Sequence, residues 1–296
     1  MNIPNLVTIR VWGDFACFTR PEMKVERVSY PIITPSAARG VLEAVYWEPQ
    51  MYYLIDSIRI HKRGRWISFR RNEVSKVISI DNAKTWMKEP QKVSYIQAGG
   101  GADDGTQRNM LALQDVEYSI TAEVRTTPLA NRPEDKLSKY LSEIERRARS
   151  GKCFHRPCLG VREFAADFDW EPIEGKKEQR PCTPTANIGT SINEDFGLML
   201  YDVFDPNDRS QGFRWLNSNE LEEQENDFES SIQTLIKGQQ TKKREDFAKN
   251  RLRSTCPPAR PQPLFFNASM RNSRMDCHPE RIQIQGLQNE GRSLCS

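Results

Sequence analysis

The longest run of strand-like alternation in the sequence, residues 110–125, constrains the fold most strongly. Its second half places apolar side chains at even positions, namely Val116, Tyr118, Ile120, Ala122 and Val124. Leu111 and Leu113 instead occupy odd positions. Because side chains alternate between the two faces of a strand, this change of phase requires a local irregularity. The pattern predicts one long strand with a β-bulge at Gln114 and Asp115.

The first 165 residues supply further elements around this strand. Strand-like stretches cover residues 6–12, 25–33, 52–60, 65–80 and 159–168, and Lys62-Arg63-Gly64 is the expected hairpin turn between the third and the fourth. A helix begins after Thr34, a suitable cap, with Pro35 in its first turn, and a second runs from Pro133 to Gly151. This order of strands and helices is typical of ferredoxin-like (RRM-like) domains with an inserted hairpin. The predicted class is α+β.

The second part of the chain, residues 166–296, is predicted to be smaller and β-rich. Residues 198–204 and a terminal hairpin from Leu264 are its strand candidates. Residues 206–262 combine an acidic run, a basic run and a proline-rich stretch, and we interpret them as a charged, poorly packed insertion. The expected division is therefore a ferredoxin-like domain at 1–165 and a β-rich part at 166–296.

Composition favours a cytoplasmic protein. The mean hydropathy is −0.70, and no run of about 18 apolar residues is present to span a membrane. The N-terminus lacks the features of a secretory signal. Seven irregularly spaced cysteines fit a reducing compartment better than a disulfide framework.

The net charge of +3 conceals unlike segments. Residues 1–125 carry +3, residues 126–236 carry −7, and residues 237–296 carry +7. The strongest basic segment, residues 59–76, holds seven Lys and Arg against one Glu, with Trp66 and Phe69 interleaved. Cations bind a phosphate backbone and aromatic rings stack on bases, so this hairpin suits single-stranded nucleic acid. The alternative is a solvated edge hairpin whose charges resist aggregation.

The first helix carries a second candidate site. Arg39, Glu43 and Tyr46 follow an i, i+4, i+7 spacing that places them opposite the apolar Val41 and Val45. A guanidinium, a carboxylate and a phenol in line could bind a phosphodiester and move a proton. A surface Arg–Glu pair beside a half-buried tyrosine is the other interpretation.

Metal and nucleotide motifs are weak or absent in the sequence. It contains no phosphate-binding loop, dinucleotide fingerprint or HExxH motif. Residues 153–158 (CFHRPC) offer three soft ligands without a fourth, and Asp103 with Asp104 stands in a glycine-rich loop. We therefore predict no metal site and no cofactor.

Several ordered blocks of sequence closely resemble the Cas-five family of CRISPR-associated RAMP proteins, subtype I-C. The blocks are VWG at 11–13 with Phe15, SYPIITPSAARG at 29–40, EAVYW at 43–47, TQRN at 106–109, LGVREF at 159–164 and GLMLYD at 197–202. The resemblance implies a ferredoxin-like RAMP domain. It also implies metal-independent cleavage of the CRISPR precursor transcript within its repeat, and retention of the 5′ handle of the guide.

The implied partners are those of the type I-C surveillance complex. They are the precursor and mature guide RNA, the Cas-seven backbone subunits and the Cas-eight large subunit, with target DNA as a further contact. The family's tyrosine on the first helix matches Tyr46. The position of its Lys-His pair, aligned on Leu113 and Val116, holds Gln114 and Asp115.

These considerations define the candidate residues. The catalytic candidates are Tyr46, Gln114 and Asp115. Because Gln114 and Asp115 lack the positive charge of the family's Lys-His pair, Arg108 or His61 is the expected source of that charge. The candidate RNA-binding residues are Arg20, Lys24, Arg39, Trp47, Lys62, Arg63, Arg65, Trp66, Arg108 and Arg162. Three functions stay open: an endoribonuclease, a non-catalytic subunit that clamps the guide 5′ end, and a metal-dependent DNA nuclease using Asp103 and Asp104.

Overall fold

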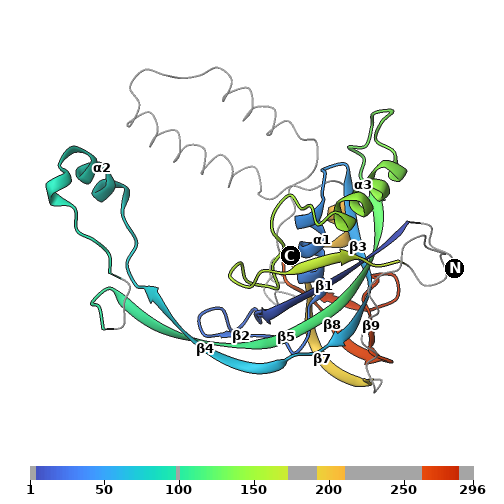
Figure 1. Ribbon diagram of the computed structural model, residues 1–296, viewed down its shortest axis with the longest axis horizontal. Coiled ribbons are helices and arrows are strands. Elements are labelled where there is room, and N and C mark those ends of the chain that lie inside the picture. The colour runs from blue at the N-terminus through green and yellow to red at the C-terminus, as the bar shows by residue number, and fades with distance from the viewer. Residues whose placement is uncertain (1–4, 98–100, 173–191, 211–261, 287–296) are drawn as a thin grey trace, which may run out of the picture.

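A large, mainly antiparallel sheet with few helices forms the molecule, so the protein is of mixed α and β structure (Figure 1). This computed structural model describes residues 5–97, 101–172, 192–210 and 262–286. The strands are β1 (Leu6–Ala16), β2 (Arg27–Val28), β3 (Met51–Lys62), β4 (Arg65–Val74), β5 (Gly105–Thr126), β6 (Asp167–Trp170), β7 (Glu194–Asp202), β8 (Leu264–Arg271), β9 (Arg274–Asp276) and β10 (Ile284–Gly286). The helices are α1 (Pro35–Val45), α2 (Ile80–Lys88), α3 (Leu137–Arg149) and α4 (Pro206–Ser210), with a 3₁₀ turn at Pro90–Lys92.

The strand order is β10-β8-β9-β3-β5-β1-β6, with β2 and β4 also pairing with β5 and β7 pairing with β8. The pairing of β2 with β5 is parallel, and the other pairings are antiparallel. The expected terminal hairpin is present as β8 and β9, and β9 joins it to β3. Strands from both sides of residue 165 therefore share one sheet.

Helix α1 begins and ends where its sequence signals predict. The Thr34 hydroxyl accepts a hydrogen bond from the Ala37 amide at 3.2 Å, and Pro35 occupies the first turn. The stripe Ala38, Val41, Leu42 and Val45 is buried against the sheet. Helices α1 and α3 lie on the same face of the sheet, as Figure 1 shows.

The two halves of β5 have different neighbours. Residues 113–126 lie between β1 and β3, whereas residues 105–114 pair with β4 in a ribbon that leaves the body of the molecule (Figure 1). We call residues 65–113 the arm. Helix α2 forms part of it and buries none of its residues. The sequence analysis did not anticipate α2.

The predicted irregularity of β5 is present at Asp115, which has a φ of 58°. The register with β1 continues through this position, while the register with the β3–β4 hairpin shifts between Ile60 and Lys62. A left-handed residue lets Leu113 and Val116 both enter the main core. The hairpin turn also lies where predicted, with Gly64 at a φ of 84°.

Two predicted strands are much shorter than expected. Residues 159–168 form a tight loop closed by a bridge between Cys158 and Ala165, and only its end enters β6. The stretch 25–33 contains only the two-residue β2. Most of the expected insertion at 206–262, and part of the glycine-rich loop near residue 100, lie outside the described residues.

Candidate active site

Tyr46 lies directly after α1, where the chain leaves the helix for β3. Its amide donates to the Leu42 carbonyl at 3.0 Å, and its side chain is only 3% exposed. The phenol donates a hydrogen bond of 2.7 Å to Oε1 of Glu48. Burial, together with the Glu48 carboxylate, raises the pKa of Tyr46 well above its usual value. The phenol therefore remains protonated at neutral pH and acts as a hydrogen-bond donor.

Two cations from α3 flank this Tyr46–Glu48 pair. The Arg147 guanidinium lies over the Tyr46 ring at 4.9 Å from its centroid, and it also forms an ion pair of 2.7 Å with Glu143. Lys139 Nζ lies 3.5 Å from Oε2 of Glu48. The sequence analysis missed Glu48, Lys139 and Arg147. Lys139 and Arg147 border the predicted apolar stripe of α3, but only the packing of α3 against α1 brings them to the tyrosine.

The arrangement combines a protonated phenol, a carboxylate and two positive charges. Such a set can accept a proton, donate a hydrogen bond and stabilise a phosphate that gains negative charge. Glu48 and Lys139 are both partly exposed, so a ligand can reach this side of the cluster.

Gln114 and Asp115 lie far from Tyr46, so the shared catalytic group expected from sequence is not formed. The Tyr53 hydroxyl donates to the Tyr46 carbonyl at 2.8 Å, and Tyr53 pairs with Val124 in β5. Asp115 precedes Val124 by nine residues, about 30 Å along an extended strand. The Asp115 side chain is exposed and forms an ion pair with Lys62 at 3.0 Å.

The two expected sources of extra positive charge are also elsewhere. Arg108 lies in the arm, opposite Arg71 of β4. His61 Nε2 is 2.6 Å from the Ser119 hydroxyl, which in turn donates to Glu171. Burial lowers the pKa of His61, which disfavours its charged form. Neither side chain contacts the Tyr46–Glu48 pair.

Arg39 is not part of an exposed polar face, contrary to the helical spacing argument. It is 6% exposed, and its guanidinium donates to Asp202 of β7 and to Glu43. Arg209 of α4 joins the same buried group, 3.7 Å from Asp202. Burial alone would lower the pKa of Arg39, but Glu43 and Asp202 raise it above its ordinary value. We call Arg39, Glu43, Asp202 and Arg209 together the Arg39–Asp202 cluster.

The residues at the β3–β4 turn differ in how freely they can bind a partner. Lys62 is paired with Asp115, and Arg63 donates two hydrogen bonds to Glu194 while lying over Phe196. Arg65 and Trp66 are exposed, with Trp66 at 50%. At the turn itself, the exposed cation–aromatic combination expected for this hairpin is therefore limited to Arg65 and Trp66, with Arg70 exposed farther along β4.

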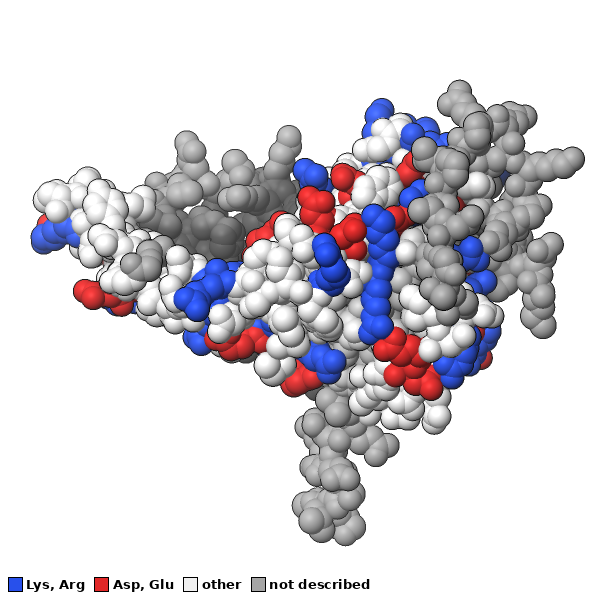
Figure 2. Space-filling model, turned by 60° about the horizontal axis from the view of Figure 1, so that its bottom comes forward, with Lys and Arg blue, Asp and Glu red and all other residues white. Residues whose placement is uncertain are grey.

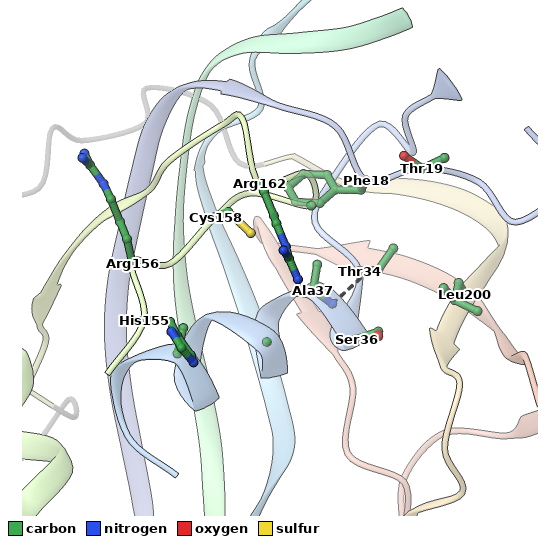
Figure 3. Close-up of a pocket in the computed structure, with 13 residues that line it drawn as sticks. Phe18, Thr19, Thr34, Ser36, Ala37, His155, Arg156, Cys158, Arg162 and Leu200 are labelled. Atoms are coloured by element: carbon green, nitrogen blue, oxygen red, sulfur yellow. Dashed lines mark hydrogen bonds between the residues drawn. The ribbon is translucent and has the colours of Figure 1, made fainter. Parts of the chain in front are cut away.

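The remaining candidates are dispersed. Arg20 lies over the Tyr30 ring at 4.9 Å and near Glu22, and Lys24 is exposed in the turn that follows. Trp47 is half-buried next to Tyr46. Arg162 is exposed and lines a groove of about 740 Å³ beside α1, together with His155 and Arg156 (Figure 3).

Comparison with known proteins identifies the family. A Cas5d family model, described as "CRISPR-associated protein (Cas_Cas5)", matches residues 6–244. The chain belongs to the Cas5 family. The "CRISPR pre-crRNA endoribonuclease Cas5d" of Mannheimia succiniciproducens is 41% identical over 204 residues, covering 67% of this chain and 85% of the relative. A protein of the same name from Thermus thermophilus is 40% identical over 195 residues, covering 66% and 72%.

Solved structures with a similar chain path are more distant from this Cas5 family member. A "Crystal Structure of CRISPR-associated Protein" covers 92% of this chain and 90% of its own, with 17% identity and a TM-score of 0.49. A second structure, of SMU1763c from Streptococcus mutans, covers 95% and 96%, with 16% identity and the same TM-score.

Many charged side chains in the described part of this Cas5 chain form ion pairs. In the view of Figure 2, Lys and Arg side chains alternate with Asp and Glu instead of forming one basic surface. Asp104, a candidate metal ligand, pairs with Lys76, which lowers its pKa. Within the described ranges, no three His, Cys, Asp or Glu side chains gather as a metal site, and no helix is long and apolar enough to cross a membrane.

Proposed function

We propose that this protein is an endoribonuclease that cuts CRISPR precursor RNA within its repeat, without a metal ion, and then holds the 5′ handle of the guide. The observation that carries the proposal is the Tyr46–Glu48 pair between α1 and α3, in a Cas5 chain whose relatives are named pre-crRNA endoribonucleases. Its phenol, carboxylate and flanking cations match the demands of RNA cleavage by the 2′-hydroxyl.

In that reaction the 2′-oxygen of the RNA forms a bond to the adjacent phosphorus, and the bond from phosphorus to the 5′-oxygen breaks. The 2′-hydroxyl loses its proton and the leaving 5′-oxygen gains one. The products are a 2′,3′-cyclic phosphate and a 5′-hydroxyl. The protein has to align these groups and stabilise the additional negative charge on phosphorus.

Each member of the site has a role consistent with its environment. Glu48, whose side chain is 34% exposed, accepts the proton of the 2′-hydroxyl. Tyr46 stays protonated, and its single hydroxyl proton, directed at Glu48 in the free protein, turns to the reacting phosphate group once Glu48 accepts the 2′ proton. Lys139 offsets the developing charge, assisted by Arg147, whose charge is shared with Glu143, and solvent protonates the leaving 5′-oxygen. These roles replace Gln114 and Asp115, which lie at the other end of this part of β5.

The test is Tyr46→Phe, which keeps the ring and removes the hydroxyl. We expect cleavage of repeat RNA in EDTA to slow by about 10²–10³-fold under single-turnover conditions, the usual effect of losing one catalytic donor. Tyr201→Phe is the matched control, because Tyr201 is a buried tyrosine of β7, 4% exposed and packed on Phe266. Equal rates for Tyr46→Phe and Tyr201→Phe would contradict the assignment.

The same assay separates the other two functions. A non-catalytic subunit that caps the guide 5′ end would bind the repeat RNA tightly and leave it intact. The buried position of the Tyr46 hydroxyl favours that alternative, since the phosphate has to approach a phenol that is already bonded to Glu48. A metal-dependent DNA nuclease would lose its activity in EDTA.

We also propose that the protein works as a subunit of a larger assembly. The type I-C surveillance complex would contain it in the cytoplasm, at the end of the Cas-seven filament and against the Cas-eight subunit, with target DNA nearby. The arm supports a role in protein contacts because its tip exposes large apolar side chains. These are Val77, Ile78, Ile80, Met87 and Tyr95, with Val77 92% exposed.

We also propose that the first part of the chain has a ferredoxin-like fold. The elements β1-α1-β3-β5-α3-β6 and the strand order β3-β5-β1-β6 agree with a ferredoxin-like unit, in which strand order is 4-1-3-2 and all neighbours are antiparallel. The arm is then an insertion between the second and third strands of this unit. The division into 1–165 and 166–296 stays a prediction, and β6 supports a boundary close to it.

A further inference from the structure

The groove beside α1 is a separate feature from the Tyr46 cluster. Its floor is the face of α1 that presents Ser36, Ala37, Gly40 and Ala44, and its roof is the 155–162 segment (Figure 3). Its volume of about 740 Å³ is in the range of ligand-binding clefts. The groove ends at Ala44, two residues before Tyr46, and so leads along the helix towards the candidate active site.

The floor contains a glycine that no contact within the described residues requires. Gly40 lies in the middle of α1, is exposed, and a Cβ placed there would meet no atom within 4 Å. Glycine in a helix interior costs about 1 kcal/mol relative to alanine. Since no close packing within the described chain explains it, the absence of a side chain fits close approach by a ligand.

The roof is held in place by the backbone. Gly160 has a φ of 90°, and a Cβ there would lie 2.0 Å from the Cys17 carbonyl oxygen. The Cys17 amide donates to the Leu159 carbonyl at 2.9 Å, and the Leu159 amide donates to the Phe164 carbonyl at 2.8 Å. This packing fixes the loop that carries Arg162, whose side chain extends towards α1 near Ala37 in Figure 3.

The charge of the groove favours an anion. The lining residues include Arg162 and Arg156, which lies 3.8 Å from Asp167, and none of those described is Asp or Glu. No carboxylate within the described residues pairs with Arg162, whereas most other arginines of the body are paired. Asp202 lies 3.4 Å from the Ser36 hydroxyl but is buried and neutralised by Arg39. The N-terminal end of α1 adds its own positive potential.

We propose that this groove binds the backbone of the RNA strand next to the cut, with a phosphate at the first turn of α1 beside Arg162. The RNA identity of the strand rests on the proposed function, but the site itself rests on the groove. Phe154, which is 74% exposed and packs edge-on against His155, supplies a stacking surface for a base at the other end. Gly40 keeps the floor low enough for the sugar–phosphate chain.

The test measures binding separately from cleavage. In the Tyr46→Phe protein, the Kd of a fluorescein-labelled oligouridylate is measured by anisotropy at several salt concentrations. Arg162→Gln is expected to raise Kd about 10-fold and to lower the slope of log Kd against log salt by about 0.7, the value for one phosphate contact to a single strand. Arg271→Gln on β8 removes the same charge elsewhere and is expected to leave both unchanged.

Gly40→Leu tests the floor without removing any charge. We expect it to raise Kd about 10-fold or more, with Gly40→Ala much closer to the parent. Both variants should melt at or above the parent temperature because they improve helix propensity. A Kd unaffected by both Arg162→Gln and Gly40→Leu would overturn the proposal, whatever Tyr46→Phe does to cleavage. Equal loss with labelled single-stranded DNA would retain the site and remove its preference for RNA.

Discussion

The two halves of β5 form one strand but lie in different surroundings. Val116, Tyr118, Ile120, Ala122 and Val124 in the second half are each at most 1% exposed, between β1 and β3 and beneath the helices. In the first half, Met110 and Ala112 are buried in a small separate cluster with Cys17 and Val161, Leu111 is 37% exposed, and farther out α2 buries none of its residues. Asp115, with its positive φ, marks the change from one environment to the other.

The packed end of β5 and the arm are therefore suited to different tasks. At the packed end, α1, α3 and β3 hold Tyr46, Glu48 and the α3 cations in fixed positions, as an active site requires. The arm packs at its base, where Ile67 and Phe69 contact the buried Met110 and Ala112, and its tip, with exposed side chains such as Val77, is suited to contacts with other macromolecules. Variants that perturb one of these regions and leave the other intact test this difference.

The largest expected effect is on stability in the packed body. Asp202→Ala leaves Arg39 and Arg209 buried without their shared carboxylate, and we expect a loss of about 3–5 kcal/mol in the free energy of unfolding. Glu73→Ala, which breaks the partly exposed ion pair with Arg71 in the arm, is expected to cost at most about 1 kcal/mol. Urea unfolding curves measure both. Similar losses would show that the arm is as tightly coupled as the body.

An intermediate effect is expected for the cations of the arm. Arg65 and Arg70 are exposed on β4, and no carboxylate in the described chain pairs with them. Replacing both with Gln should lower the slope of log Kd against log salt for single-stranded RNA by about 1.4, at about 0.7 per contact. Arg63→Gln should change the slope less, because Glu194 already holds that guanidinium. An unchanged slope in the double variant would mean that the arm does not bind RNA.

The smallest effect is expected at Asp115. Asp115→Asn removes the charge while keeping a residue that tolerates positive φ, so the fold should be retained. Cleavage of repeat RNA should stay within about 3-fold of the parent, in contrast to Tyr46→Phe, because about 30 Å of strand separates the two sites. A loss as large as that of Tyr46→Phe would show that RNA or a partner brings both ends of the strand into one site.

Local signals in the sequence predicted local structure well. The Thr34 cap, the turn at Gly64 and the irregularity at Asp115 are confirmed. Each depends on a few neighbouring residues whose backbone preferences are strong. The family blocks likewise identified the Cas5 relationship that the comparisons show.

Positions that depend on packing were harder to predict. Arg39 and Tyr46 were expected to be on an open helix face, but β7 and α4 cover Arg39, and Tyr46 leaves the helix altogether. Spacing along a helix cannot reveal which later strand will cover it. The same limit applies to Lys139 and Arg147, which are ordinary charged residues of α3 until that helix packs against α1.

The amino-acid sequence alone was enough to assign the family, the start and end of the first helix, and the change of phase in the long strand. The family follows from the ordered blocks of sequence, and the other two follow from short-range backbone preferences and side-chain alternation. The neighbours of Tyr46 depended on the folded chain: Glu48 and Arg147 contact Tyr46, Lys139 contacts Glu48, and Gln114 and Asp115 lie elsewhere. They lie apart because β5 is extended, so Asp115 is about 30 Å along the strand from Val124, which pairs with the Tyr53 that contacts Tyr46.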